Sequence, residues 1–470
     1  MHSNVHENEP NEMHGHTLFN ATSALAPRLG RLCFPGRKSI QTPHYIPITS
    51  RGAMPHVSHD VMRDHVPTQS LYIALEDFIE RGPRETPPVY QFPSPSREST
   101  LRNFLSLPDD LVLVLGPRRV PPVVCSAPNT SNSISILTSV GFRQLEEEEY
   151  VKAIQTLRPD FSIGLSDIVL GQPPGVKRRE KMVDRTHAWT RDAVKQLYGS
   201  TVPGQTRPLF LAPLLPLEKE IQSMYVQELE DEMKEFISGF ALFDASATLV
   251  VPESMSHLIR LCFGNASTPH DILREILLGV DLTTAPFVTA LSDAGLAFDF
   301  TFPQPLKRDN SSPLPLAIDI WSTDHSTDVS PLVAGCECYS CTTHHRAYIQ
   351  HLLNAKEMLA WTLLQIHNHQ FMTNFFAAIR KSISNGSFSQ DVDTFQRVYE
   401  SKFPEQTGLG PRIRGYQTRS EYGAQKKNPK VYGRLDDHVE KLMEAESSVA
   451  TPETGAGGLE AHGFAKILDQ

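Results

Sequence analysis

Three cysteines, Cys336, Cys338 and Cys341, stand one and two residues apart in the segment CECYSC. A tight loop with this spacing can place three thiolates around one ion, and a tetrahedral zinc ion would then take one further ligand. Five histidines follow in the same part of the chain and are candidates for that position: His344, His345, His351, His367 and His369.

A helix predicted to run from about Arg346 to residue 380 favours His367. Leu352, Leu359 and Leu363 share one face of such a helix, and His367 extends this face by one turn. If the helix folds back on the cysteine loop, it delivers His367 to the open position. The resulting zinc site would fasten the helix to the rest of the fold.

The other histidines are weaker candidates. His344 and His345 follow the loop so closely that three thiolates and a histidine would crowd a single turn. His369 is expected to point almost opposite to His367, toward solvent. A Cys3His set supplies all four zinc ligands from protein and leaves no position for an activated water, so the predicted role of one Zn²⁺ ion is structural.

Composition indicates a folded, intracellular chain. Of 470 residues, 40% are apolar and 21% charged, which is typical of globular proteins. The net charge of -10 argues against general coating of nucleic acid, although a local basic patch could bind RNA. Six cysteines are too few for a secreted disulfide scaffold, and Cys33, Cys125 and Cys262 are expected to be ordinary buried thiols.

The sequence shows neither a secretory signal at its start nor an apolar run of the roughly 18 residues that a membrane helix needs. We therefore expect a cytoplasmic protein with no integral membrane contact.

Alternating strand and helix patterns favour a parallel α/β fold, and a (β/α)8 TIM-type barrel fits them best. Helices are predicted at 146–157, 179–199 and 256–264. Strands are predicted at 44–50, 70–76, 111–116, 133–139, 160–166, 209–215, 239–245, 277–283 and 296–302.

We divide the chain into five parts. The predicted parts are a disordered tail (1–20), the barrel (21–330), a zinc-binding subdomain (331–385), a closing helix of the barrel (386–404) and a basic, glycine-rich extension with a flexible tail (405–470).

Basic residues gather in two places. The extension interleaves Arg and Lys with Tyr416, Tyr422 and Tyr432, a composition that suits either single-stranded RNA or a solvated, loosely ordered segment. A second block, at residues 177–181, is expected to open a helix and to form a solvated face or part of a phosphate-binding surface.

The segment from CECYSC through RAYIQHLLNAKEMLAWTLLQIHN resembles the zinc subdomain of the tRNA-guanine transglycosylases. The resemblance extends over roughly residues 22–400 and includes TPHYIPITSRGAMPHVSHDVM, RPDFSIGLSD, SGFALFD and GVDLTTAPFVTALSDAGLAFDF. It implies a (β/α)8 barrel and an exchange of guanine for queuine, or a precursor, at the wobble position of tRNAs with GUN anticodons.

Two departures from this family concern catalysis. The family nucleophile is the second aspartate of Gly-Val-Asp-x-Phe-Asp, and here GVDLTT places Thr284 at that position. Asp281 matches a different family aspartate and is not expected to reach the same point. The second acid of the family lies in Asp-Ser-Gly-Gly-Phe-Gln, which this chain lacks; residues 71–100 occupy the region without an equivalent. We therefore expect no catalytic residues.

Further segments resemble the non-catalytic members of this family: SALAPRLGRL, LYIALEDF, PSRESTLRNF and VKRREKMVDRTHAW. This resemblance implies a heterodimer with a catalytic queuine tRNA-ribosyltransferase subunit, contact with the tRNA anticodon stem-loop, and pairing through the zinc subdomain. A homodimer is the form implied in the absence of the partner, and the family also implies peripheral association with the mitochondrial outer membrane. Two alternatives are an active transglycosylase that uses a displaced carboxylate such as Asp281, and a zinc-stabilised barrel scaffold without a tRNA role.

Overall fold

A computed structural model describes residues 15–20, 25–79, 86–95, 98–139, 141–199, 208–304 and 312–411. Most of the predicted N-terminal tail and nearly all of the basic extension, including its three tyrosines, lie outside these residues.

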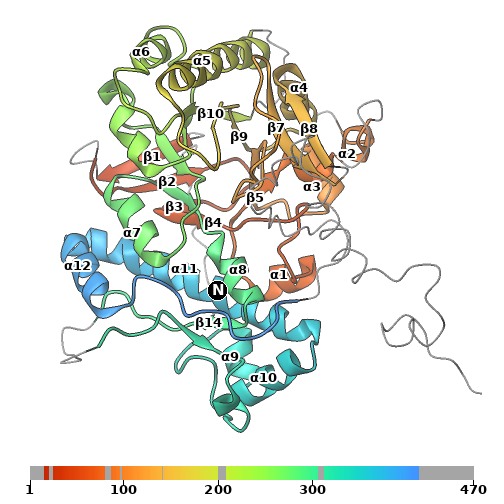
Figure 1. The fold of residues 1–470 in the computed structure, drawn as a ribbon, viewed down its shortest axis with the longest axis vertical. Coiled ribbons are helices and arrows are strands. Elements are labelled where there is room, and N and C mark those ends of the chain that lie inside the picture. Colours follow the sequence, from red (N-terminus) through yellow and green to blue (C-terminus); the bar gives the residue numbers. More distant parts are fainter. Residues whose placement is uncertain are drawn as a thin grey trace, which may run out of the picture. The chain divides into compact units, whose positions relative to one another are not determined.

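Eight parallel strands form a barrel (Figure 1). In chain order they are β4 (His44–Ile46), β5 (Ser70–Ala74), β6 (Val112–Gly116), β9 (Phe161–Ile163), β10 (Leu209–Leu214), β11 (Gly239–Leu242), β12 (Ile259–Cys262) and β13 (Leu282–Thr284). From β5 to β13, neighbours in this order pair with each other, and β13 pairs with β4. A bridge between Ile48 and Tyr72 joins β4 to β5, so the predicted (β/α)8 barrel is confirmed.

Helices cover the outside of the barrel. They are α1 (His59–His65), α2 (Pro88–Gln91), α3 (Thr100–Leu105), α4 (Glu147–Leu157), α5 (Val176–Tyr198), α6 (Ser223–Asp231), α7 (Pro269–Leu277) and α8 (Phe287–Asp293). The predicted helices at 146–157 and 179–199 correspond to α4 and α5. The helix predicted at 256–264 is wrong, because this segment contains β12. Periodicity does not separate a short apolar run in a buried strand from one in a helix.

Two predicted strands lie outside the barrel sheet. The segment 133–139 forms β7 (Ser133–Thr138), which pairs antiparallel with β8 (Gly141–Glu146). The segment 296–302 contains β14 (Leu296–Phe298), which pairs antiparallel with β15 (Ala317–Asp319).

An antiparallel sheet precedes the barrel. It consists of β1 (Gly15–Asn20), β2 (Leu29–Cys33) and β3 (Ile40–Thr42), so residues 15–20 form a strand although the sequence predicts a tail there. Leu32 and Ile40 from this sheet join the apolar core inside the barrel. The barrel is thus filled by side chains, as is usual for this architecture.

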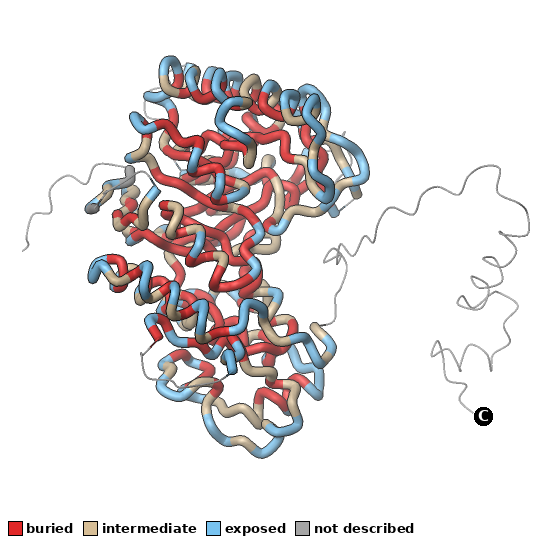
Figure 2. Tube along the Cα trace, turned by 60° about the vertical axis from the view of Figure 1, so that its left-hand side comes forward, coloured by how far each residue is buried: buried red, intermediate tan, exposed pale blue. Residues whose placement is uncertain are grey.

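The C-terminal part of the described chain consists of short helices around one long one. They are α9 (Tyr339–Thr343), α10 (Arg346–Asn354), α11 (Met358–Ser384) and α12 (Phe388–Val398). The continuous helix predicted from Arg346 is wrong, because the helix is interrupted between α10 and α11. Lys356 lies in this interruption and has a left-handed backbone conformation, with a φ of 58°. Burial is concentrated in the barrel strands and the inner helix faces (Figure 2). None of the described helices could span a membrane.

Candidate metal centre and barrel mouth

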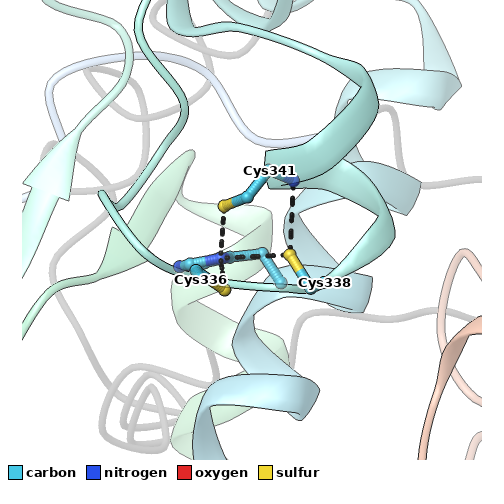
Figure 3. A group of neighbouring side chains, drawn as sticks. Cys336, Cys338 and Cys341 are labelled. Carbon is cyan, nitrogen blue, oxygen red and sulfur yellow. Dashed lines mark hydrogen bonds between the residues drawn. The ribbon is translucent and has the colours of Figure 1, made fainter.

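The structure brings Cys336, Cys338, Cys341 and His367 together, and their ligand atoms lie within 4.8 Å of one another. The three cysteine side chains converge on one point (Figure 3). The Nδ1 atom of His367 lies 3.7, 3.6 and 3.4 Å from the sulfurs of Cys336, Cys338 and Cys341. Tetrahedral zinc, with its usual bond lengths, would separate sulfur from nitrogen by about 3.6 Å. The four side chains therefore fit a zinc ion in both type and spacing.

Local structure explains why the cysteines converge. Gly335 precedes the loop with a φ of 77°, a left-handed conformation that glycine adopts without strain. Cys338 is the N-cap of α9, and its sulfur accepts a hydrogen bond from the backbone N–H of Cys341. The hydroxyl of Ser340 donates to the carbonyl of Leu363, which ties α9 to α11 beside the cluster. The loop and both helices thus meet at the candidate site.

His367 is oriented from its other side. Its Nε2 atom lies 3.0 Å from the carbonyl oxygen of Phe298 on β14, so Nε2–H donates and Nδ1 is left to face the sulfurs. An outer hydrogen bond of this kind fixes the tautomer of a metal-binding histidine. Burial opposes the charged form of His367, but hydrogen bonds with Cys336 and Cys341 outweigh it and raise the pKa of His367 to about 9.

The sulfurs also perturb one another. Hydrogen bonds from the thiols of Cys338 and Cys341 lower the pKa of Cys336, whereas the contact with Cys336 raises the pKa of Cys338. These hydrogen bonds thus favour ionisation of the Cys336 sulfur over that of Cys338. A bound cation would allow all three to ionise, and such a closed set gives zinc a structural role.

The expectation for His369 is wrong. Its side chain is only 2% exposed, and its Nδ1 atom lies 3.1 Å from the hydroxyl of Tyr45 on β4. Leu359, which the sequence places on the face shared with His367, is 41% exposed instead. His369 is buried because the barrel covers that side of α11. Leu359 is exposed because α11 begins at Met358, so this residue lies in its first turn.

Asn368 is a structural residue that the sequence reasoning missed. Its side-chain oxygen accepts from the backbone N–H of Phe298, and its amide donates to Ser292 and to the carbonyl of Leu296. Three adjacent residues of α11 thus have different contacts: His367 belongs to the candidate zinc cluster, Asn368 bonds to β14, and His369 contacts the barrel strand β4. A polar triplet within an apolar helix, here His-Asn-His, is the signal that could have indicated this role.

The other three cysteines lie apart from this cluster. Cys262 is buried as expected, whereas Cys33 and Cys125 are only partly buried.

Thr284 ends β13 at the carboxyl end of the barrel, which is the usual position of catalytic groups in this architecture. Its side chain is fully buried, and its hydroxyl donates to the carbonyl oxygen of Gly264. Among the described residues, no carboxylate or imidazole contacts this hydroxyl. A neutral hydroxyl without a neighbouring base is a poor nucleophile.

Asp281 lies before β13, toward the amino end of the strands. Its carboxylate forms a buried ion pair with Arg28 and accepts a hydrogen bond from the backbone N–H of Arg260 at 2.8 Å. Arg28 also donates to the carbonyls of Ser256 and Leu258. Asp281 and Thr284 are three residue steps apart along the extended chain, or roughly 10 Å. Asp281 therefore holds the base of the barrel together.

Further carboxylates follow the carboxyl ends of the barrel strands, and sequence reasoning singled out none of them; Glu76, Asp77 and Asp167 are among them. Glu76 and Asp77 directly follow β5; Glu76 accepts from the backbone N–H groups of Arg119 and Leu137, and Asp77 pairs with the guanidinium of Arg119. Burial raises the pKa of Glu76.

Asp167 follows β9. It accepts from both terminal nitrogens of Arg178 at 2.6 Å, and from Arg185 and Asn129. Burial favours its neutral form, but these hydrogen bonds outweigh that effect and lower the pKa of Asp167. The basic block opens α5 as predicted, yet Arg178 is bound to Asp167 and Arg179 to Glu218.

The mouth of the barrel is nearly filled. Its cavity measures about 20 Å³ and is lined by Tyr72, Arg118, Gly164 and Phe263 among others. The Tyr72 hydroxyl donates to the carbonyl of Arg118, and a side-chain carbon added at Gly116 would lie 2.0 Å from that hydroxyl. A second cavity, of about 130 Å³, shares Arg118 and Ile168 with it. Ligand pockets usually enclose ~300–1,000 Å³, so both cavities are smaller than a typical binding site.

Comparison with known proteins agrees with this architecture. A family model described as queuine tRNA-ribosyltransferase matches residues 23–401. A Schizosaccharomyces pombe protein named queuine tRNA-ribosyltransferase accessory subunit 2 is 34% identical over 386 residues, which cover 81% of this chain and 83% of that relative. Proteins of the same name from Anopheles gambiae and Xenopus tropicalis are 27% and 26% identical; each match covers 75% of this chain, and 82% and 92% of those relatives. The predicted resemblance is confirmed, and this chain belongs to the queuine tRNA-ribosyltransferase family.

Proposed function

We propose that this chain is the non-catalytic subunit of a queuine tRNA-ribosyltransferase heterodimer, and that its partner carries out the base exchange. The observation that carries this proposal is the state of the barrel mouth. Its two adjoining cavities measure about 20 and 130 Å³, less than a base-binding pocket usually has, and Thr284 stands where the family has its nucleophile.

The chemistry of the family explains why this matters. A carboxylate must attack the anomeric carbon of the ribose as guanine leaves, and a second acid must transfer protons to and from the bases. Glu76, Asp77 and Asp167 already accept hydrogen bonds from arginines or backbone N–H groups. Each would have to lose these partners before it could act on a ribose.

The zinc cluster supports assembly in this proposal. Zinc held by Cys336, Cys338, Cys341 and His367 would cross-link the cysteine loop to α11. Hydrogen bonds from His367 and Asn368 to Phe298 connect α11 to β14. Apolar side chains are exposed on the two helices that supply ligands, among them Tyr339 on α9 and Met358 and Leu359 at the start of α11. This surface is suited to contact with the catalytic subunit, because exposed aromatic and apolar side chains are typical of interface cores.

The subunit would extend the surface that holds the anticodon stem-loop, so that guanine at the wobble position of tRNAs with GUN anticodons reaches the partner's active site. We place the heterodimer in the cytoplasm, with peripheral attachment to the mitochondrial outer membrane.

Reconstitution with a catalytic subunit tests the proposal. We expect a one-to-one complex that exchanges labelled guanine into tRNA, whereas this chain alone has no measurable activity. Exchange by the purified chain alone would contradict the non-catalytic role. A chain that neither binds the catalytic subunit nor changes its affinity for tRNA would point to a scaffold without a tRNA role.

A further inference from the structure

A cavity of about 340 Å³ lies at the amino ends of the barrel strands, opposite to the mouth. His44 at the start of β4 and Gln69 just before β5 line it on the barrel side. Arg380 on α11 and Lys38, between β2 and β3, line it on the other sides. The cavity is thus much larger than the one at the mouth, and nothing in the proposed function uses it.

The charged side chains that line this cavity are cationic. Arg380 donates one hydrogen bond, from Nη1 to the carbonyl of Pro43 at 2.8 Å, and forms no ion pair with any residue that the structure describes. Lys38 pairs with Asp110 at 2.5 Å, but both side chains are about half exposed, so this pair is weak. Asp110 does not line the cavity, and neither does any other carboxylate.

His44 adds an unsatisfied polar atom. Its side chain is 7% exposed, and its Nε2 atom is buried without a hydrogen-bond partner in the described chain. Burial, together with the charge of Arg380, lowers the pKa of His44 to about 3, so its ring is neutral and one ring N–H is available as a donor. Buried polar groups usually have a partner, and the imidazole of His44 is a polar group in the wall of the cavity.

We propose that this cavity binds a phosphate group, either as inorganic phosphate or as part of a small phosphomonoester. The planar guanidinium of Arg380 matches the geometry of phosphate oxygens, and Lys38 supplies a second positive charge. His44 and the side-chain amide of Gln69 can donate to the remaining oxygens. The volume exceeds that of one phosphate and leaves room for a small organic group.

Calorimetric titration of the full, zinc-loaded chain with inorganic phosphate tests the proposal, with chloride at equal ionic strength as the reference. We expect saturable binding of phosphate alone. Arg380→Gln should weaken it at least tenfold and Lys38→Gln about threefold. Arg397→Gln, which changes an exposed arginine on α12, should leave it unchanged. A titration with glycerol phosphate distinguishes a site for inorganic phosphate from a site for a phosphomonoester. A phosphomonoester site should bind glycerol phosphate more tightly than inorganic phosphate.

Phosphate binding that is absent, or equal in Arg380→Gln and the unmodified chain, would overturn the proposal. Lys38 is exposed, so Lys38→Gln keeps the test valid even if Arg380→Gln does not fold. The nitrogen resonances of His44 should also shift with phosphate in the unmodified chain. Displacement of phosphate by an isolated anticodon stem-loop would assign the site to the RNA backbone and would likewise overturn a small-molecule site.

Discussion

The zinc cluster and the barrel mouth differ in how their polar groups are satisfied. At the cluster, three sulfurs lie 3.4–3.7 Å from the Nδ1 atom of one imidazole, and a bound cation would let all three sulfurs ionise. At the mouth, Glu76, Asp77 and Asp167 each have cationic or N–H partners within the chain. The cluster is incomplete without a ligand, whereas the mouth is complete without one.

This difference is what the proposed non-catalytic role predicts for the two regions. A site that acts on a substrate keeps groups that the fold itself does not satisfy, because those groups must be free to bind it. By that criterion the mouth is part of the core. The zinc cluster and the cavity at His44 are two places where the described chain has groups available for a ligand.

Loss of a zinc ligand should have the largest effect. We expect Cys338→Ser to abolish zinc binding and to remove stability of order 10 kcal/mol, the apparent contribution of a structural zinc. Metal analysis and thermal unfolding measure both. His351→Ala, on the exposed side of α10, is the control and should keep one zinc per chain. Full zinc content in Cys338→Ser would refute the assigned ligands.

Asp281→Asn tests whether this carboxylate is structural. It leaves Arg28, which is 1% exposed, without its counter-charge, and should lower the free energy of unfolding by about 3–5 kcal/mol. Urea unfolding checks this value, with Asp64→Asn in an exposed ion pair as the control. Base exchange by the reconstituted heterodimer, per folded chain, should not change. Lost exchange with unchanged stability would mark Asp281 as a displaced nucleophile.

Gly116→Ala tests whether the mouth is filled. The new methyl group would collide with the ring of Tyr72, so we expect a loss of about 1–3 kcal/mol from overpacking. Gly175→Ala, where no atom lies within 4 Å, is the control in the same unfolding experiment. Adding Tyr72→Phe, which removes the closest atom, should recover part of the loss. A neutral Gly116→Ala would mean that the mouth is open.

Thr284→Ala should have the smallest effect. It removes one buried hydrogen bond, to Gly264, worth about 1 kcal/mol. Base exchange by the heterodimer should stay within twofold of the unmodified complex. A large drop in exchange with intact folding would show that Thr284 takes part in the reaction.

The barrel and the grouping of the cysteines with His367 could be predicted from the sequence, because both depend on local patterns. Strands buried on both faces form continuous apolar runs, and the phase between Leu363 and His367 holds within α11. The break at Lys356 was not predicted, since no proline or glycine marks it.

Contacts between distant segments could not be predicted. Arg28 meets Asp281 across 253 residues, and only the closed barrel brings them together. The same applies to Asp77, whose partner Arg119 lies beyond the next strand. The prediction that His369 faces solvent was wrong for the same reason. Its partner Tyr45 lies near the other end of the sequence.

That last contact has a consequence for how the chain folds. Tyr45 on β4, the first barrel strand, is 324 residues from His369. An early-synthesised segment can therefore complete its packing only after a late one has been made. Contacts of such long range slow folding, because the entropy of closing the loop is lost before the contact forms. A chain that stops before α11 would leave β4 uncovered. A premature stop codon in this late stretch should therefore yield an aggregation-prone product, although every barrel strand has already been translated.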